Sequence, residues 1–134
     1  MDKKEIFQFI SENPIGFLAT VEGKAGRVRG MDTFRADEKG LIFYTGKMKN
    51  VFQQIADNPN VEVCYFAKGV QVRVRGKMEV LEDLALKKEI VNKRPFLQGA
   101  YENSYEGMAV CRLKGRATTW SMQDMAAPTT FIDL

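Results

Sequence analysis

The chain has 134 residues, of which 45% are hydrophobic and 28% charged, with a formal net charge of +3 and no histidine. These proportions are typical of a soluble globular protein, and the length predicts one domain spanning residues 1–134. The lack of histidine excludes Ser-His-Asp and Cys-His catalysis and a histidine-ligated haem, and two cysteines cannot build an all-cysteine zinc site. The small positive charge suits an anionic small ligand and argues only weakly for nucleic acid.

Three features of the sequence predict a cytoplasmic protein that does not enter a membrane. No stretch approaches the roughly 20 apolar residues that a membrane-spanning helix needs. The N-terminus, Met1–Glu5, is too acidic, and the apolar run that follows too short, for a secretory signal. Cys64 and Cys111 each lie in an apolar, strand-like run without a Cys-x-x-Cys spacing, so we expect both to be buried small hydrophobic residues.

The first half of the chain predicts a helix, three strands and a second helix. Residues 2–12 have the pattern of an amphipathic helix with Asp2 as its N-cap, and Asn13-Pro14 ends it. We expect strands at 16–22, 27–35 and 41–45, and then a helix that begins near Val51 and ends at Asn58-Pro59.

The second half predicts two strands joined by a tight turn, a third helix, and one or two closing strands. The expected elements are strands at 61–67 and 70–81, a helix at 83–93, an irregular or short helical stretch at 95–107, and closing strands at 108–113 and 116–121. The tail from Met122 onward has no clear period. Long antiparallel strands with only short helices between them argue against a doubly wound parallel sheet, and the predicted class is α+β with a barrel.

Three segments group polar residues in a way that a core does not need. In Arg27–Asp32, two arginines two positions apart lie on one side of a strand. In Tyr44–Asn50, a strand end runs into a helix start with a hydroxyl and two lysines, a combination suited to phosphate. Gln71–Gly76 has a glutamine and two arginines on one face. Each segment alone is also compatible with the solvated face of a barrel strand.

Taken together, the segments resemble the FMN-binding split barrels related to pyridoxamine 5′-phosphate oxidase, over roughly residues 6–121. The likeness rests on Arg29 with the strand after it, on Phe43-Tyr-Thr45 followed by Lys49, on Asn58–Val63, and on Gln71–Gly76. It implies a six- to seven-stranded antiparallel split β-barrel with short flanking helices. It also implies FMN as cofactor, held at the interface of a homodimer.

The resemblance further implies which residues contact the cofactor. Arg29, Thr45 and Lys49 would lie near the FMN phosphate, Gln71 near flavin or ribityl atoms, and residues 30–34 along the isoalloxazine edge. Trp120 corresponds to a tryptophan beside the flavin, although the only tryptophan of the chain is equally suited to a core. The full set of expected cofactor-binding residues is Arg27, Arg29, Gly30, Met31, Tyr44, Thr45, Lys49, Asn50, Gln71 and Trp120.

The departures from the oxidase pattern bear on the reaction. Phe34 stands where the oxidase has a lysine, the loop between Thr45 and Lys49 is shorter, and no Arg-x-His segment follows, so we do not expect oxidation of pyridoxamine phosphate. Arg73 or Arg75 is a candidate for stabilising the reduced flavin, and no residue is a convincing general acid or base.

Two functional classes follow from the resemblance. The first is an FMN-dependent oxidoreductase that acts on a small planar or nitro-type substrate with NADH or NADPH as donor. The alternative is a non-catalytic flavin- or deazaflavin-binding protein or redox sensor. The physiological substrate is not identified by the sequence.

Overall fold

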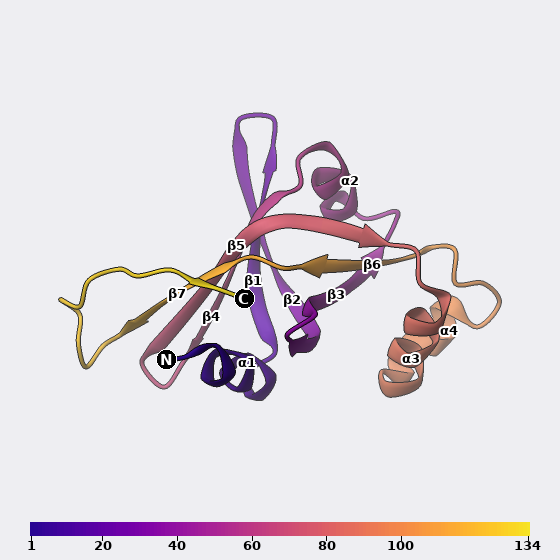
Figure 1. Ribbon diagram of the computed structural model, residues 1–134. Coiled ribbons are helices and arrows are strands. Elements are labelled where there is room, and N and C mark those ends of the chain that lie inside the picture. The colour runs from indigo at the N-terminus through magenta and orange to yellow at the C-terminus, as the bar shows by residue number, and fades with distance from the viewer.

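The structure is a computed structural model that describes all residues 1–134. Four short α-helices flank eight antiparallel strands (Figure 1). The elements are α1 (Lys3–Glu12), β1 (Ile15–Glu22), β2 (Ala25–Asp37), β3 (Gly40–Gly46), α2 (Asn50–Asp57), β4 (Asn60–Ala67), β5 (Val70–Leu81), α3 (Leu84–Lys93), a 3₁₀ turn (Pro95–Leu97), α4 (Gln98–Tyr101), β6 (Met108–Leu113), β7 (Arg116–Ser121) and β8 (Ile132–Asp133).

Six of the strands form a closed barrel. The sheet runs in the order β4-β1-β2-β3-β6-β5-β7-β8, and a further pairing between β4 and β5 closes the ring of the first six. The long strand β5 makes this possible because it pairs with β4 and β7 over its first part and with β6 at Met78–Leu81. The predicted antiparallel split barrel of class α+β is therefore confirmed.

The closing segment differs in one respect from the prediction. Residues 108–121 form two strands, but only β6 belongs to the ring, and β7 lies beside β5 outside it. The break between them falls at Lys114-Gly115, where the chain moves from one part of β5 to another. The tail then adds the two-residue strand β8, which its lack of periodicity did not predict.

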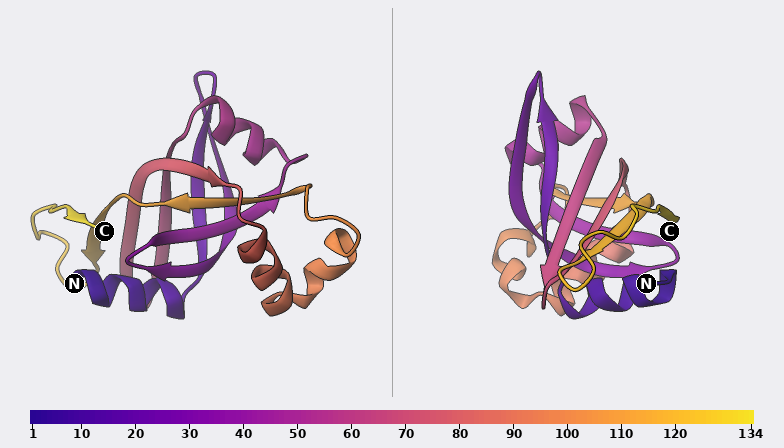
Figure 2. Two further views of the ribbon diagram at one scale, coloured as in Figure 1. Left: turned by 45° about the vertical axis from the view of Figure 1, so that its right-hand side comes forward. Right: turned by 90° about the vertical axis from the view of Figure 1, so that its left-hand side faces the viewer.

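The helices cover the openings and one side of the barrel. Asp2 caps α1 as predicted, because its carboxylate accepts a hydrogen bond from the backbone N–H of Glu5 at 2.8 Å. Figure 2 shows α1 lying across one end of the barrel, while α2 lies toward the opposite end. No helix is long and apolar enough to cross a lipid bilayer.

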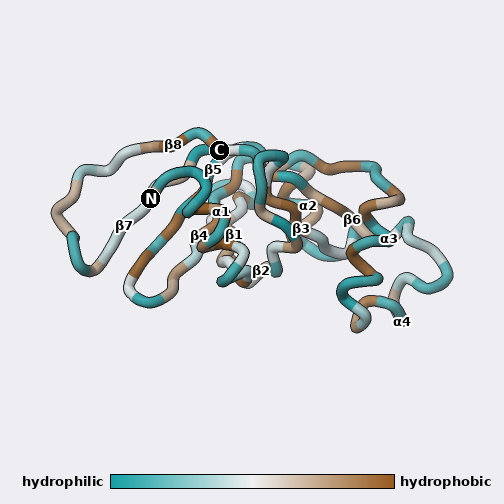
Figure 3. The backbone as a smooth tube through the Cα atoms, turned by 60° about the horizontal axis from the view of Figure 1, so that its bottom comes forward, coloured by the Kyte–Doolittle hydropathy of each residue, from teal (hydrophilic) through white to brown (hydrophobic).

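The core has two parts. The larger part fills the barrel with side chains such as Leu18, Phe43 and Val74, all fully buried. The smaller part lies outside β3 and β6, where Ile42 and Val110 pack under α3. Strand β3 is thus buried on both faces, and Figure 3 shows the hydrophobic stretches of β3 and β6 that this requires.

The two cysteines have different environments. Cys111 is buried, as predicted, and burial raises the pKa of its thiol to about 11. Cys64 is only partly buried, so the expectation of a buried residue is wrong there. The reason is the alternation of β4, in which Val63 and Tyr65 point into the barrel and Cys64 points outward. Both cysteines are free thiols.

We expect the replacement of Gly115 by alanine to destabilise the fold strongly. A Cβ atom at this position would lie 2.1 Å from the backbone oxygen of Arg75, where the chain crosses β5. We expect a loss of about 2–4 kcal/mol, because backbone must move to relieve the overlap. Gly26→Ala is the matched control, since its Cβ would meet no atom within 4 Å, and its effect should stay within about 0.5 kcal/mol. Chemical denaturation of both variants measures the difference, and equal midpoints would contradict the prediction.

Candidate functional site

An exposed sheet face runs across β2, β1, β4, β5 and β7 on the outside of the barrel. One row of directly paired residues crosses it, from Gly30 through Phe17, Cys64 and Arg73 to Thr118. Paired residues of antiparallel strands share a face, and alternate residues along each strand do so too. We call this the outer face, and its members include Ile15, Phe17, Ala19, Val28, Gly30, Asp32, Glu62, Cys64, Phe66, Gln71, Arg73, Arg75, Arg116, Thr118 and Trp120.

Several large apolar side chains of the outer face are exposed to solvent. Phe17 is 56%, Phe66 55% and Val28 69% exposed. They lie on neighbouring strands together with the half-exposed Ile15, so the apolar area is continuous rather than scattered. A continuous apolar patch on a chain of this size marks a surface that contacts a partner or a ligand.

The β7 end of the outer face carries a cavity of about 550 Å³. Gln71 pairs directly with Trp120 across β5 and β7, and both line this cavity with Arg73. Trp120 is 37% exposed and points outward, so it is not a core residue. Asp124, Ala127 and Thr129 of the tail form another wall. The cavity thus combines an aromatic ring, an amide and a guanidinium, a suitable lining for a planar polar ligand.

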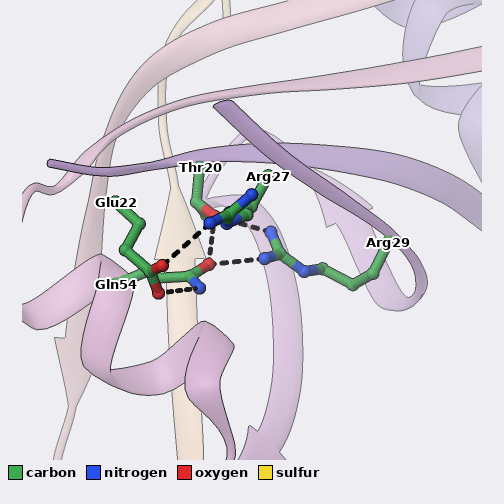
Figure 4. Close-up of polar contacts among 5 residues, drawn as sticks. All are labelled: Thr20, Glu22, Arg27, Arg29 and Gln54. Carbon is green, nitrogen blue, oxygen red and sulfur yellow. Dashed lines mark hydrogen bonds and ion pairs between the residues drawn. The ribbon is translucent and has the colours of Figure 1, made fainter. Parts of the chain in front are cut away.

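On the side of β2 opposite the outer face, a partly buried polar network surrounds Arg29 (Figure 4). The guanidinium of Arg29 donates to Thr20 Oγ1 at 2.7 Å, to the backbone oxygen of Leu18 at 3.1 Å, and to Gln54 Oε1 at 2.5 Å. Thr20 also donates to Gln54 Oε1, at 2.6 Å. Alternation along β2 explains this, because Arg29 shares its side of the strand with the buried Met31 and so points toward the barrel end.

Arg29 differs from most arginines of the chain in having no carboxylate partner. Six of the eight arginines lie within 4 Å of an acidic side chain, and the exceptions are Arg29 and Arg75. The guanidinium carbon of Arg75 lies over the ring of Phe131, 4.1 Å from its centre. Arg29 is partly buried, and this burial lowers its pKa. A partly buried cation held only by neutral acceptors is suited to an anionic ligand.

The start of α2 lies next to this network. Lys49 is the N-cap residue and Asn50 the first residue of α2, and neither side chain makes a hydrogen bond or ion pair within the chain. The first backbone N–H groups of a helix lack partners and carry partial positive charge. Gln54, which contacts Arg29, follows Asn50 by four residues, or about 6 Å along the helix axis. Thr45 is buried at the end of β3, just before this loop.

Tyr44 and Asp32 belong to a second network, on the side of β2 and β3 opposite the Arg29 side chain. The Tyr44 hydroxyl donates to Asp32 Oδ2 at 2.5 Å, and Arg94 Nε donates to the same oxygen at 2.8 Å. Arg94 follows α3 and also lies over the ring of Phe34, 5.3 Å from its centre. The predicted contact residue Tyr44 thus has its hydroxyl engaged within the chain.

We expect the free energy of unfolding to fall as pH rises above about 10, in part through Tyr44. Burial first, and then the hydrogen bond to the Asp32 carboxylate, raises the pKa of Tyr44 in the folded chain. Its stabilising contribution is fully present below the unfolded pKa and is lost above it, because only the unfolded chain ionises readily there. Asp32→Asn should lower the pKa of Tyr44, measured by phenolate absorbance during alkaline titration. An unchanged titration curve would contradict the prediction.

The predicted cofactor-binding residues therefore fall into two groups. Arg29, Thr45, Lys49 and Asn50 gather at the α2 end of β2 and β3, whereas Gln71 and Trp120 lie beside the cavity. Four strand spacings separate β2 from β7, which amounts to about 19 Å along the sheet. One chain does not bring the two groups together.

Three further predicted cofactor-binding residues, Arg27, Gly30 and Met31, belong to neither group. Arg27 forms an exposed ion pair with Glu22 at 3.1 Å. Gly30 lies on the outer face, where a Cβ would be 3.9 Å from the Ile15 side chain. Met31 is buried in the core, so only its backbone is available to a ligand.

Sequence reasoning did not identify Gln54 or Arg94. For Gln54 a signal exists, because it shares the buried face of α2 with Val51 and Ile55, and a polar residue on an apolar helix face needs a partner. Arg94 offers no such signal in the sequence, since its contact with Asp32 joins residues 62 positions apart.

The closed antiparallel barrel with an exposed outer face defines a split β-barrel protein. A family model described as pyridoxamine 5′-phosphate oxidase matches residues 2–120, and the chain belongs to this family. Members of the family usually bind flavin or related ligands and are commonly dimeric. No curated protein matches the chain.

Several solved structures are similar to the chain. A NimC/NimA family protein from Clostridium acetobutylicum is 25% identical, with 98% of this chain and 93% of that chain covered and a TM-score of 0.80. General Stress Protein 26 from Bacillus anthracis is 22% identical, covers 98% of both chains and has a TM-score of 0.75. PhzG from Burkholderia lata, in complex with tetrahydrophenazine-1-carboxylic acid, is 13% identical, with 98% of this chain and 89% of that chain covered and a TM-score of 0.74.

Proposed function

We propose that the protein is an FMN-dependent oxidoreductase that holds one FMN at each of two equivalent sites in a homodimer. It reduces a small planar or nitro-type substrate with NADH or NADPH as donor. Membership of the pyridoxamine 5′-phosphate oxidase family supports the cofactor class. The free thiols are compatible with the reducing cytoplasm that we expect.

The observation that carries the proposal is the set of donors at the α2 end. Arg29 brings a guanidinium without an acidic partner, Lys49 a free ammonium, and α2 the unpaired N–H groups of Asn50 and Val51. Phosphate binds such a set through charge-assisted hydrogen bonds and the helix dipole. The donor chemistry therefore fits the phosphate of FMN, and Thr45 and Asn50 are further polar contacts for it.

The exposed outer face supports the proposed homodimer. An interface between two copies of this face would remove Phe17, Phe66 and their neighbours from water. A two-fold axis that lies in the interface and runs parallel to the strands would place the β2 end of one copy against the β7 end of the other. The phosphate residues of one chain and the Gln71–Trp120 cavity of the second chain would then contact the same ligand.

The chain's own residues would bind and orient the cofactor, and the flavin would supply the redox chemistry. Arg73 lines the cavity, whereas Arg75 is stacked on the ring of Phe131, which favours Arg73 as the cation that stabilises the reduced flavin. We assign no general acid or base to the reaction.

The test is an absorption spectrum of the purified protein, followed by identification of the released cofactor and measurement of the molar mass in solution. The proposal predicts flavin bands, FMN near one per subunit, and a dimer. Steady oxidation of NADH or NADPH that is stimulated by an acceptor separates an enzyme from a storage protein or sensor. A protein that takes up no FMN, or that binds deazaflavin in preference, contradicts the proposal.

A further inference from the structure

The amide of Gln54 bonds to a cation at one end and to a carboxylate at the other. Its oxygen accepts from Arg29 at 2.5 Å, and its nitrogen donates to Glu22 Oε2 at 3.0 Å. The second oxygen of Glu22 is held by Arg27 at 3.1 Å. Figure 4 shows the resulting chain of contacts from Arg27 through Glu22 and Gln54 to Arg29.

Arg29 and Glu22 thus bond to the same amide instead of to each other. A partly buried guanidinium gains most from a direct contact with a carboxylate, and six other arginines of the chain have one. Here Gln54 occupies the place that the carboxylate would take. Gln54 is 5% exposed, so water does not replace it easily, and Thr20 fixes its oxygen by donating to it at 2.6 Å.

The orientation of the Gln54 amide is determined by its neighbours. Thr20 and Arg29 both donate to one end, which must be the oxygen, and Glu22 accepts from the other end, which must be the nitrogen. The hydrogen bond from Gln54, followed by that from Arg27, lowers the pKa of Glu22. Glu22 therefore stays ionised and would attract Arg29 if nothing separated them.

We propose that Gln54 is a positioning residue that keeps Glu22 away from Arg29 and so leaves the charge of Arg29 available to the phosphate of the ligand. This inference rests on the proposed function, because it assumes that Arg29 binds FMN phosphate. It adds a residue that touches no ligand itself and acts through Arg29.

Gln54→Glu tests the inference most directly, since it keeps the shape of the side chain and places a carboxylate in contact with Arg29. We expect FMN affinity to fall about 100-fold, because a protein carboxylate now competes with the phosphate. Affinity for riboflavin, which lacks the phosphate, should change less than about three-fold. Flavin fluorescence titration measures both.

A second pair of variants separates positioning from packing. Gln54→Ala removes the spacer, and we expect FMN affinity to fall about 10-fold as Glu22 moves onto Arg29. Adding Glu22→Gln removes the competing charge and should restore most of that affinity, which a loss of packing alone would not allow. Gln53→Ala, an exposed neighbour on α2 that bonds to Asp57, is the matched control. Thermal unfolding checks that every variant folds.

The outcomes distinguish this inference from the proposed function. A normal preference for FMN over riboflavin, combined with an unchanged Gln54→Glu variant or with no restoration by Glu22→Gln, overturns the role of Gln54 alone. A wild-type protein that binds no FMN, or binds riboflavin equally well, contradicts the phosphate site itself and the role of Gln54 with it.

Discussion

Replacement of Arg29 by alanine should weaken FMN binding by about 100-fold while leaving riboflavin affinity within about three-fold of its original value. Hydrogen bonds to charged groups contribute about 1.5–3 kcal/mol each, and each 1.4 kcal/mol is a factor of ten in affinity. Arg29 has no acidic partner, so its removal leaves no carboxylate unpaired. The loss should therefore fall on the ligand's phosphate.

Titration of flavin fluorescence with FMN and riboflavin in parallel gives both affinities. Arg112→Ala serves as the control, because Arg112 on β6 is paired with Glu79 on β5, away from the Arg29 network and from the cavity. Equal losses for both flavins would indicate that Arg29 supports the fold rather than the phosphate. In that case the denaturation midpoint of Arg29→Ala should fall as well.

A heterodimer of two chains with different substitutions in the cofactor site should regain about half of the wild-type FMN content. One chain carries Arg29→Ala and its partner carries Gln71→Ala with Trp120→Ala, so each homodimer has a defect in both of its sites. If each site takes its phosphate residues from one chain and its cavity from the other, the heterodimer has one intact site and one doubly damaged site. Two different affinity tags and sequential purification isolate the heterodimer after co-expression.

Flavin content per dimer, measured by absorbance after release, decides between two arrangements. A heterodimer that holds as little flavin as either homodimer would mean that each site lies within one chain. That result would contradict the shared site that we infer from the separation of β2 and β7 along the sheet. Two Arg29→Ala chains with different tags, purified in the same way, provide the control and should remain empty.

The secondary structure was predicted almost completely from local patterns. Asp2 and Asn13-Pro14 correctly predicted where α1 begins and ends, because capping and proline effects act within one helical turn. The apolar run at 41–45 and the alternation at 70–81 identify β3 and β5 because burial imposes a period on the side chains. The short β8 was missed, since its two residues are held by contacts with β7 rather than by any pattern of their own.

The candidate site was predictable only in part. Family resemblance pointed to the residues of both groups, but not to their separation, with Arg29 beside α2 and with Gln71 and Trp120 beside the cavity. The partners of Arg29 lie 9 to 25 residues away in the chain, and Gln54 joins Arg29 to Glu22 only because α2 packs against the β1–β2 end of the barrel. Such contacts depend on tertiary packing, so no local pattern encodes them.

By itself, then, the sequence determined the order and type of the elements, the antiparallel barrel class and the family, because propensity, periodicity and motif spacing are properties of neighbouring residues. Tertiary structure alone decided that Cys64 and Trp120 face outward and that Arg29 lacks an acidic partner. It also decided that β7 and its Trp120, which was predicted to bind the same cofactor as Arg29, lie four strand spacings from β2. These depend on strand register and on the closure of the barrel, which bring together residues distant in the chain and set the face on which each side chain lies.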